Sequence, residues 1–184
     1  MKHNGPRVKT DISLEQYQEF SALLGFKTLI TQIVYLYFDT SARIREAKLL
    51  KEKIRLRAKI KNGIYSLQLK NKAKGNIFEV KDILSFEEFQ KLLQGEFPLG
   101  RVKEALSAFD LLGGIKLVGA TLVLQKRNDF MGGTLTLNQT ICQSEISHQL
   151  EFSARSQEQI DSFNDRFALV EKFTSKLRRF WKAK

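Results

Sequence analysis

The residues best suited to chemistry lie in the segment KEKIRLRAKIKNGIYSLQLKNK, residues 51–72. Within it, Arg55, Arg57 and Lys59 alternate with apolar residues, and Asn62-Gly63 follows. Strict alternation is typical of a β-strand, whose side chains point to its two faces in turn. An Asn-Gly pair is the strongest short-range signal for a two-residue hairpin turn. The segment therefore predicts a β-hairpin with one apolar face and one cationic face.

The predicted turn also sets the register, which places Arg55 opposite Lys70 and Arg57 opposite Gln68. Like charges directly opposite one another destabilise a sheet, and two unit charges ~5 Å apart at an effective dielectric of ~20 repel by about 3 kcal/mol. On an exposed face, solvent would screen this repulsion to below ~1 kcal/mol, and the charges would only discourage edge pairing. Alternatively, the charges converge on a bound phosphate group, which Arg and Lys recognise well. The hairpin alone leaves both interpretations open.

The whole chain is basic, with 31 Lys and Arg against 20 Asp and Glu and a net charge of +11 over 184 residues. This excess suggests a phosphate-bearing partner. The length is that of one domain, residues 1–184. Because no apolar run approaches 18 residues and the N-terminus lacks a signal-peptide core, we expect a cytoplasmic protein without a transmembrane segment. A lone cysteine, Cys142, excludes an intramolecular disulfide.

Several common kinds of site have no signature in the sequence. Zinc sites need clustered Cys and His, and nucleotide-binding loops of the GxxxxGK[ST] or GxGxxG type are not found. Cys142 and His148 could in principle form a nucleophile–base pair. We interpret them instead as a small buried residue and an ordinary strand residue.

Helix-capping residues and the alternation of apolar and polar residues indicate the remaining helices and strands. Helices are expected to begin at Ser13, Ser85 and Ser156, each followed three residues later by Gln or Glu, and another is expected around residues 102–114. Strands are expected over residues 6–12, 30–40, 76–84, 115–127, 132–140 and 147–153, besides the hairpin. About eight mostly antiparallel strands with inserted helices make an α+β fold. Periodicity alone does not separate an open sheet from a closed barrel with a polar lining.

The C-terminal segment KLRRFWKAK, residues 176–184, mixes basic and aromatic residues. Such a mixture contacts nucleic acid or anionic lipid in some proteins. A basic last turn also complements the dipole of its own helix, which is the simpler interpretation.

Short motifs then occur in an order that resembles a known family. They are Lys9 in the first strand, YFDT at 37–40, IRLR at 54–57, YSLQLK at 65–70, FEV around Glu79, GGTLTL at 132–137 and QLEF at 149–152. This order resembles the CYTH family, the triphosphate tunnel metalloenzymes, and in particular its small bacterial members. The resemblance covers about residues 7–153, and residues 156–184 would form a C-terminal helix and a basic tail.

The resemblance implies an eight-stranded antiparallel β-barrel with helices packed outside. Family members bind a triphosphate on Lys and Arg inside the barrel and hold one or two Mg²⁺ or Mn²⁺ ions on carboxylates. Their activities include hydrolysis of thiamine or inorganic triphosphate, RNA 5′-triphosphate processing and adenylate cyclase chemistry. Carried over to this chain, the phosphate ligands are Lys9, Arg55, Arg57 and Lys70, with Lys59 and Lys126 as additional candidates. The acids at matching positions are Glu79 and Glu151, the candidate metal ligands.

The acidic part of the family pattern is largely missing. The first strand of the family reads ExExK, but Gly5 and Arg7 stand at its two Glu positions. Asn138 stands in place of an Asp, Gln149 in place of the first Glu of a late ExE, and Gln125 in place of an Arg. Mg²⁺ needs one or two carboxylates in addition to phosphate oxygens. We therefore expect Mg²⁺ or Mn²⁺ to be weakly held or absent.

These observations lead to one main hypothesis and two alternatives. The main one is a protein that binds a triphosphate or polyphosphate group through a basic interior, with weakened or lost hydrolysis. The first alternative is an active metal-dependent triphosphatase or an adenylate-cyclase-type enzyme. The second is a basic nucleic-acid-binding module, whose affinity would fall steeply with salt.

Overall fold

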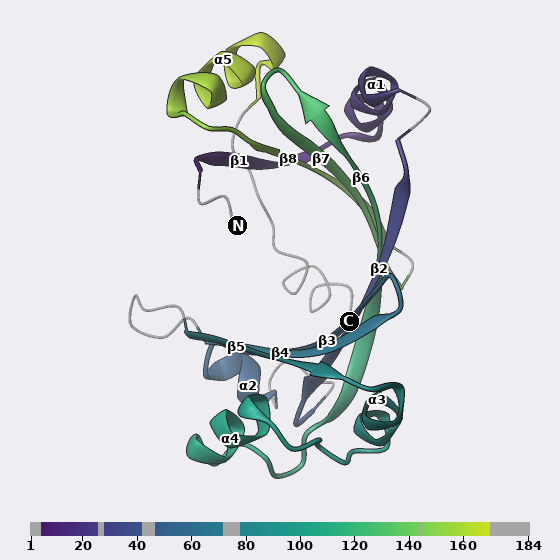
Figure 1. The fold of residues 1–184 in the computed structure, drawn as a ribbon, viewed down its shortest axis with the longest axis vertical. Helices are drawn as coiled ribbons and strands as arrows, with labels where there is room; N and C mark the ends of the chain where they lie inside the picture. The colour runs from purple at the N-terminus through teal and green to yellow at the C-terminus, as the bar shows by residue number, and fades with distance from the viewer. Residues whose placement is uncertain (1–4, 26–27, 42–46, 72–77, 144, 170–184) are drawn as a thin grey trace. The chain divides into compact units, whose positions relative to one another are not determined.

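The computed structural model describes residues 5–25, 28–41, 47–71, 78–143 and 145–169. Eight strands form one sheet in the order β1-β8-β7-β6-β2-β3-β4-β5 (Figure 1). Every strand pair with a described register is antiparallel. The expected α+β fold with an eight-stranded antiparallel sheet is therefore confirmed.

The strands are β1 (Arg7–Ile12), β2 (Ile30–Asp39), β3 (Ile54–Lys61), β4 (Ile64–Asn71), β5 (Phe78–Leu84), β6 (Lys116–Phe130), β7 (Gly133–Cys142) and β8 (Glu145–Ser153). The helices are α1 (Leu14–Leu24), α2 (Lys48–Lys51), α3 (Phe86–Leu93), α4 (Arg101–Ala108) and α5 (Gln157–Phe167). Among the described residues, none of the helices combines the length and the apolar character needed to span a bilayer. The basic tail lies outside the described residues.

The chain forms two compact units, each with its own core. Of the described residues, unit 1 contains those up to Gln32 and those from Leu122 to Leu169, and unit 2 contains Ile33–Thr121. Strands β2 and β6 run through both units. The expectation of a single domain stays a prediction.

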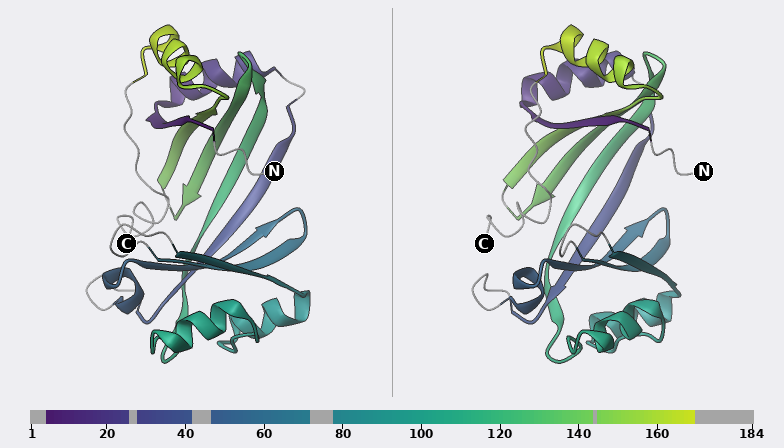
Figure 2. Two further views of the ribbon diagram at one scale, coloured as in Figure 1. Left: turned by 60° about the vertical axis from the view of Figure 1, so that its left-hand side comes forward. Right: turned by 90° about the vertical axis from the view of Figure 1, so that its left-hand side faces the viewer.

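Unit 1 buries the apolar face of β1, β8 and β7 under α1 and α5, which lie on the same side of these strands (Figure 2). Phe163 of α5 stacks on Phe152 of β8, with ring centroids 4.1 Å apart. Gly133 begins β7 directly against this pair, and a Cβ there would lie 2.6 Å from the Phe152 ring and from the Ser153 carbonyl oxygen. The close approach explains why the strand begins with glycine.

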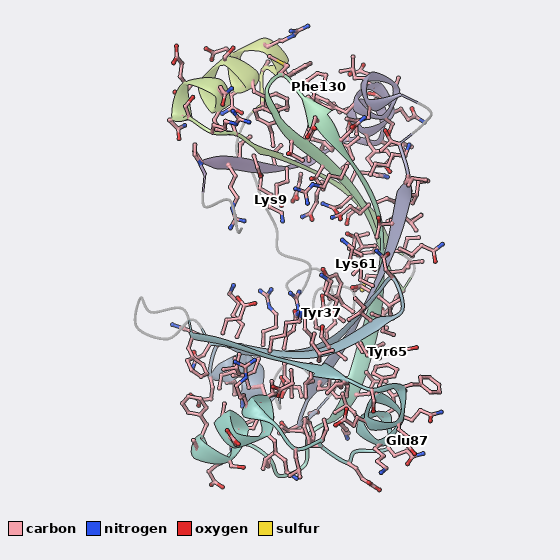
Figure 3. The ribbon with its side chains drawn as sticks, in the orientation of Figure 1. Lys9, Tyr37, Lys61, Tyr65, Glu87 and Phe130 are labelled. Atoms are coloured by element: carbon pink, nitrogen blue, oxygen red, sulfur yellow. The ribbon has the colours of Figure 1, made fainter. Side chains whose placement is uncertain are left out.

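Unit 2 packs α3 and α4 against the apolar face of the β3–β4 hairpin. Leu56, Leu67 and Leu69 from the strands and Leu106 from α4 are at most 2% exposed. Asp82 of β5 joins α4 to the sheet, because its carboxylate accepts a 2.8 Å hydrogen bond from the backbone N–H of Val102. Tyr37 and Tyr65 lie on opposite sides of these strands, and only Tyr65 lies on the side of α3 (Figure 3).

The three predicted capping boxes are present. Ser13, Ser85 and Ser156 each accept a hydrogen bond from the backbone N–H three residues later, and the side-chain oxygen of that later residue accepts one from the backbone N–H of the cap. These reciprocal bonds satisfy donors that a helix start otherwise leaves open. The helix starts were therefore readable from local sequence.

Two elements differ from expectation. The helix expected around residues 102–114 ends at Ala108, and Asp110 adopts a left-handed φ of 51° just beyond it. The short helix α2 was not expected. It follows Asp39, whose buried carboxylate accepts hydrogen bonds from the backbone N–H groups of Thr40 and Leu49 at 2.7 and 3.0 Å. Such a side-chain cap has no clear sequence signature because ten residues separate donor and acceptor.

Candidate anion-binding site

The predicted hairpin is confirmed in both its turn and its register. Asn62 and Gly63 adopt positive φ angles of 51° and 73°, as a tight hairpin turn requires. Arg55 lies opposite Lys70, and Arg57 lies opposite Gln68. The alternate residues of both strands pack into the core of unit 2. The cationic side chains of the hairpin therefore share the face that α3 and α4 do not cover.

We call this surface the basic face of unit 2, and strand β5 extends it. The register places Glu79 beside Lys70 and Lys81 beside Gln68. The basic side chains of this face, within the described residues, are Arg55, Arg57, Lys59, Lys61, Lys70 and Lys81. Lys81 was not identified from the sequence, although it follows Glu79 by two residues and residues two apart on a strand lie on the same face.

Arg57 is held in place on this face by two neighbours. Its Nε donates a 3.0 Å hydrogen bond to Oε1 of Gln68. Its guanidinium lies over the ring of Tyr35, 4.4 Å from the centroid. Stacking on an aromatic ring and a bond at Nε together orient the planar guanidinium, which favours bidentate recognition of an oxyanion.

Arg55 is half-buried next to Arg57. Burial lowers the pKa of the Arg55 guanidinium below its usual value, and the charge of Arg57 adds to this effect. Its buried Nε has no hydrogen-bond partner among the described residues. A buried donor without a partner is costly, so an anion accepting that bond would relieve both the desolvation and the repulsion between the two arginines.

Lys59 and Lys70 have contrasting surroundings. Lys70 Nζ forms a 2.9 Å salt bridge with Oε2 of Glu79. Lys59 instead lies between Tyr35 and Ser66 on the neighbouring strands. Burial lowers the pKa of the Lys59 ammonium, and the charges of nearby cations lower it further.

The polar face of unit 1 carries a different set of side chains. Lys9 points away from the helix-covered side (Figure 3) and forms a 2.9 Å salt bridge with Glu151, whose other oxygen lies 3.9 Å from Arg7. One row further along β1 and β8, Gln149 donates a 3.0 Å hydrogen bond to Asp11. This face therefore combines ion pairs with amide hydrogen bonds.

The neighbouring strands β6 and β7 continue that face. Gln125 donates a 2.9 Å hydrogen bond to Oδ1 of Asn138. Arg127 lies opposite Thr136 on the same face and was not identified from the sequence. Lys126 lies opposite Leu137 on the helix-covered face, with its Nζ 5.9 Å from the ring centroid of Tyr17. The structure thus separates Lys126 from the polar face on which the other candidates of unit 1 lie.

Two residues that could have formed a nucleophile–base pair lie on opposite faces of unit 1. The buried Cys142 shares the polar face with Thr140, whereas His148 contacts the ring of Tyr17, 4.6 Å away, on the helix-covered face. This arrangement agrees with the interpretation of both as ordinary strand residues.

The two candidate metal ligands, Glu79 and Glu151, each form an ion pair with a lysine. Glu79 and Glu151 belong to different units, and each contacts a lysine at 2.9 Å. In the part of the chain that the structure describes, no group of three His, Cys, Asp or Glu side chains could hold a metal ion. A hard cation would have to compete with the two ammonium groups and would find amides where it needs charged oxygens.

Comparison with known proteins identifies solved structures that have the same fold. No protein-family model matches the sequence, and no curated protein sequence matches it. The crystal structure of a proposed adenylate cyclase from Bacillus halodurans superposes with a TM-score of 0.80 at 23% identity, over 96% of this chain and 97% of that chain. A proposed adenylyl cyclase from Hippeastrum, with a dominant triphosphatase activity, superposes with a TM-score of 0.76 at 19% identity, over 97% and 95%. At these identities the likeness establishes the fold.

Proposed function

We propose that this chain, which has the fold of the CYTH-type tunnel proteins, binds a triphosphate or a similar polyanion on the basic face of unit 2. Arg55, Arg57 and Lys70 are its main anion ligands, and Lys59 is an additional one. Lys9 stays a separate candidate ligand on the polar face of unit 1. Hydrolysis of the bound polyanion is weak or absent.

The observation that carries this proposal is the environment of Arg55. A half-buried guanidinium lies beside a second guanidinium and opposite an ammonium group, and its Nε has no hydrogen-bond partner among the described residues. Such an arrangement opposes folding unless something compensates it, and Glu79, which pairs with Lys70, offsets only part of it. A polyanion supplies several charged oxygens at once, and charge-assisted hydrogen bonds to phosphate are among the strongest in proteins.

The likeness to solved structures supports the class of ligand. One structure with this fold is that of a protein with a dominant triphosphatase activity. A triphosphate carries enough negative charge to offset the cations of the basic face, whereas a single phosphate does not. We therefore expect the affinity to rise with the number of linked phosphates.

The test is calorimetric titration of tripolyphosphate into the full-length protein, first with EDTA and then with excess Mg²⁺. We expect binding in EDTA that the double variant Arg55→Ala/Lys70→Ala abolishes. The matched control is Arg155→Ala/Lys91→Ala, which removes one Arg and one Lys at exposed positions outside the basic face. Equal affinities of the two double variants would refute the site.

A second candidate function is metal-dependent hydrolysis of a triphosphate, which the activity of the Hippeastrum protein favours. In that case Mg²⁺ or Mn²⁺ would bind together with the substrate, with Glu79 or Glu151 as carboxylate ligands. Phosphate release that requires the metal and disappears in Glu151→Gln would support this function. Tight binding in EDTA without any release of phosphate would support the first proposal instead.

A further inference from the structure

Lys59 differs from Lys9 and Lys70 in the residues that lie opposite it on the neighbouring strands. Lys9 and Lys70 each contact a carboxylate at 2.9 Å. Lys59 has Tyr35 on one neighbouring strand and Ser66 on the other. Neither neighbour carries a negative charge at neutral pH. The ammonium form of Lys59 thus lacks the stabilisation that the other two lysines receive from a directly opposed acid.

The charged groups that affect Lys59 within the described part of the chain are positive. Arg57 and Lys61 precede and follow it on the same face of β3, and Lys81 lies on β5, diagonally beyond Ser66. The side chain is also half-buried. Burial first, and then Lys61, Arg57 and Lys81, lower the pKa of its ammonium group. A larger share of Lys59 is therefore the neutral amine, which is the nucleophilic form of lysine.

The same cations are placed where they can attract an anionic reagent. Arg57 and Lys61 lie two residues on either side of Lys59, and strand residues two apart are ~7 Å apart along the chain. Their long side chains can hold a phosphate group next to the Lys59 amine. A phosphate bound there would bring an attached electrophilic carbon close to that amine, and such proximity raises the rate strongly.

We propose that Lys59 is an acylation site for small acyl phosphates, whose phosphate group binds to Arg57, Lys61 and Lys81. The neutral amine attacks the carbonyl carbon, and a nitrogen–carbon bond forms. The bond between that carbon and the bridging phosphate oxygen breaks, and its electron pair leaves with the phosphate. The proton lost by the amine is taken up by the departing phosphate, so the products are an acylated lysine and inorganic phosphate.

Acylation has a direct consequence for the basic face. It replaces a cation by a neutral amide within a cluster that already suits anions. The modified protein therefore binds polyanions more weakly than the unmodified one. The basic face would in this way respond to the supply of activated acyl groups.

The test is site-resolved acylation of the full-length protein by acetyl phosphate at about pH 8, without any polyphosphate. Initial rates at Lys59 and at the exposed Lys91 of α3 are measured by peptide mass spectrometry. We expect Lys59 to react about tenfold faster or more, because its lowered pKa leaves a larger share of it as the amine and the bound phosphate adds proximity. Equal rates at the two lysines would overturn the proposal.

A second reagent separates anchoring by phosphate from simple reactivity, and a double variant tests the role of the neighbouring cations. Acetic anhydride carries no phosphate, so the preference for Lys59 should be smaller with it; the same preference with both reagents would overturn the proposal. The variant Lys61→Gln/Lys81→Gln removes two of the phosphate anchors and also two of the charges that lower the Lys59 pKa. It should therefore lose most of the preference with acetyl phosphate, and an unchanged preference would likewise refute the proposal. Because no polyphosphate is present, the outcome is independent of whether tripolyphosphate binds at Arg55.

Discussion

Replacing Glu79 by Gln should tighten the binding of tripolyphosphate in EDTA. Glu79 holds the ammonium group of Lys70 at 2.9 Å and is the acid that lies beside Lys70 on the basic face. A bound phosphate must share Lys70 with this carboxylate and is repelled by it. Gln has nearly the same shape, keeps a hydrogen-bonding oxygen and removes the negative charge.

The size of the effect follows from the geometry of this salt bridge. A phosphate oxygen bound on the far side of the Lys70 ammonium lies ~6 Å from the Glu79 carboxylate, and unit charges at that distance repel by about 0.7 to 2.8 kcal/mol for dielectrics of ~80 to ~20. The side chain of Glu79 is 46% exposed, so screening favours the lower end. We expect a gain of about 1 kcal/mol, which is about a fivefold lower Kd.

Calorimetry of Glu79→Gln against the wild type measures this gain, with Glu87→Gln as the matched control. Glu87→Gln changes the net charge of the protein by the same amount. Glu87 lies on α3, on the other side of the strands from Tyr37 (Figure 3), so its substitution leaves the basic face of unit 2 unchanged. The gain should also shrink as salt is added. Weaker binding of Glu79→Gln, in EDTA or in Mg²⁺, would refute the reasoning and make Glu79 a metal or substrate ligand.

Three further outcomes concern stability. Gly133→Ala should destabilise unit 1 by about 1 to 3 kcal/mol, measured by urea denaturation, because the new Cβ overlaps the Phe152 ring; an unchanged midpoint would contradict this packing. Asp82→Ala should cost about 1 kcal/mol through the lost cap at Val102, whereas Asp82→Asn should recover part of that loss. Lys59→Gln should stabilise the ligand-free protein by about 0.5 kcal/mol at pH 7, since it removes a half-buried charge and its repulsion from neighbouring cations. Because the folded-state pKa of Lys59 is lowered, the wild type gains stability as rising pH removes the proton from Lys59. The stability advantage of Lys59→Gln should therefore shrink toward pH 10. An advantage that stays constant or grows with pH would contradict this reasoning.

The features that were predicted correctly depend on neighbours in the chain. The register of the β3–β4 hairpin follows from the turn at Asn62-Gly63, because a two-residue loop pairs the flanking residues directly. The starts of α1, α3 and α5 follow from capping boxes only four residues long. In each case the deciding interaction joins groups that are close in sequence.

The features that were missed depend on pairings that are distant in sequence. Lys81 joins the basic face because β5 pairs with β4 in one particular register. Arg127 lies on the polar face of unit 1 and Lys126 on the opposite face, because a shift of one residue along a strand moves a side chain to the other face. Adjacent basic residues cannot be assigned to faces before the register of β6 and β7 is known.

The sequence by itself determined the cationic hairpin, the capped helices, the α+β class and the loss of acids from the family pattern. Each of these depends on residue type and short spacing, which govern backbone preference and side-chain alternation. Only the tertiary structure decided that Lys9 and Lys70 contact carboxylates while Lys59 lies between Tyr35 and Ser66. The physical reason is that the charge state and reactivity of a side chain depend on burial and on the groups across the sheet, which strand pairing brings together from distant parts of the chain.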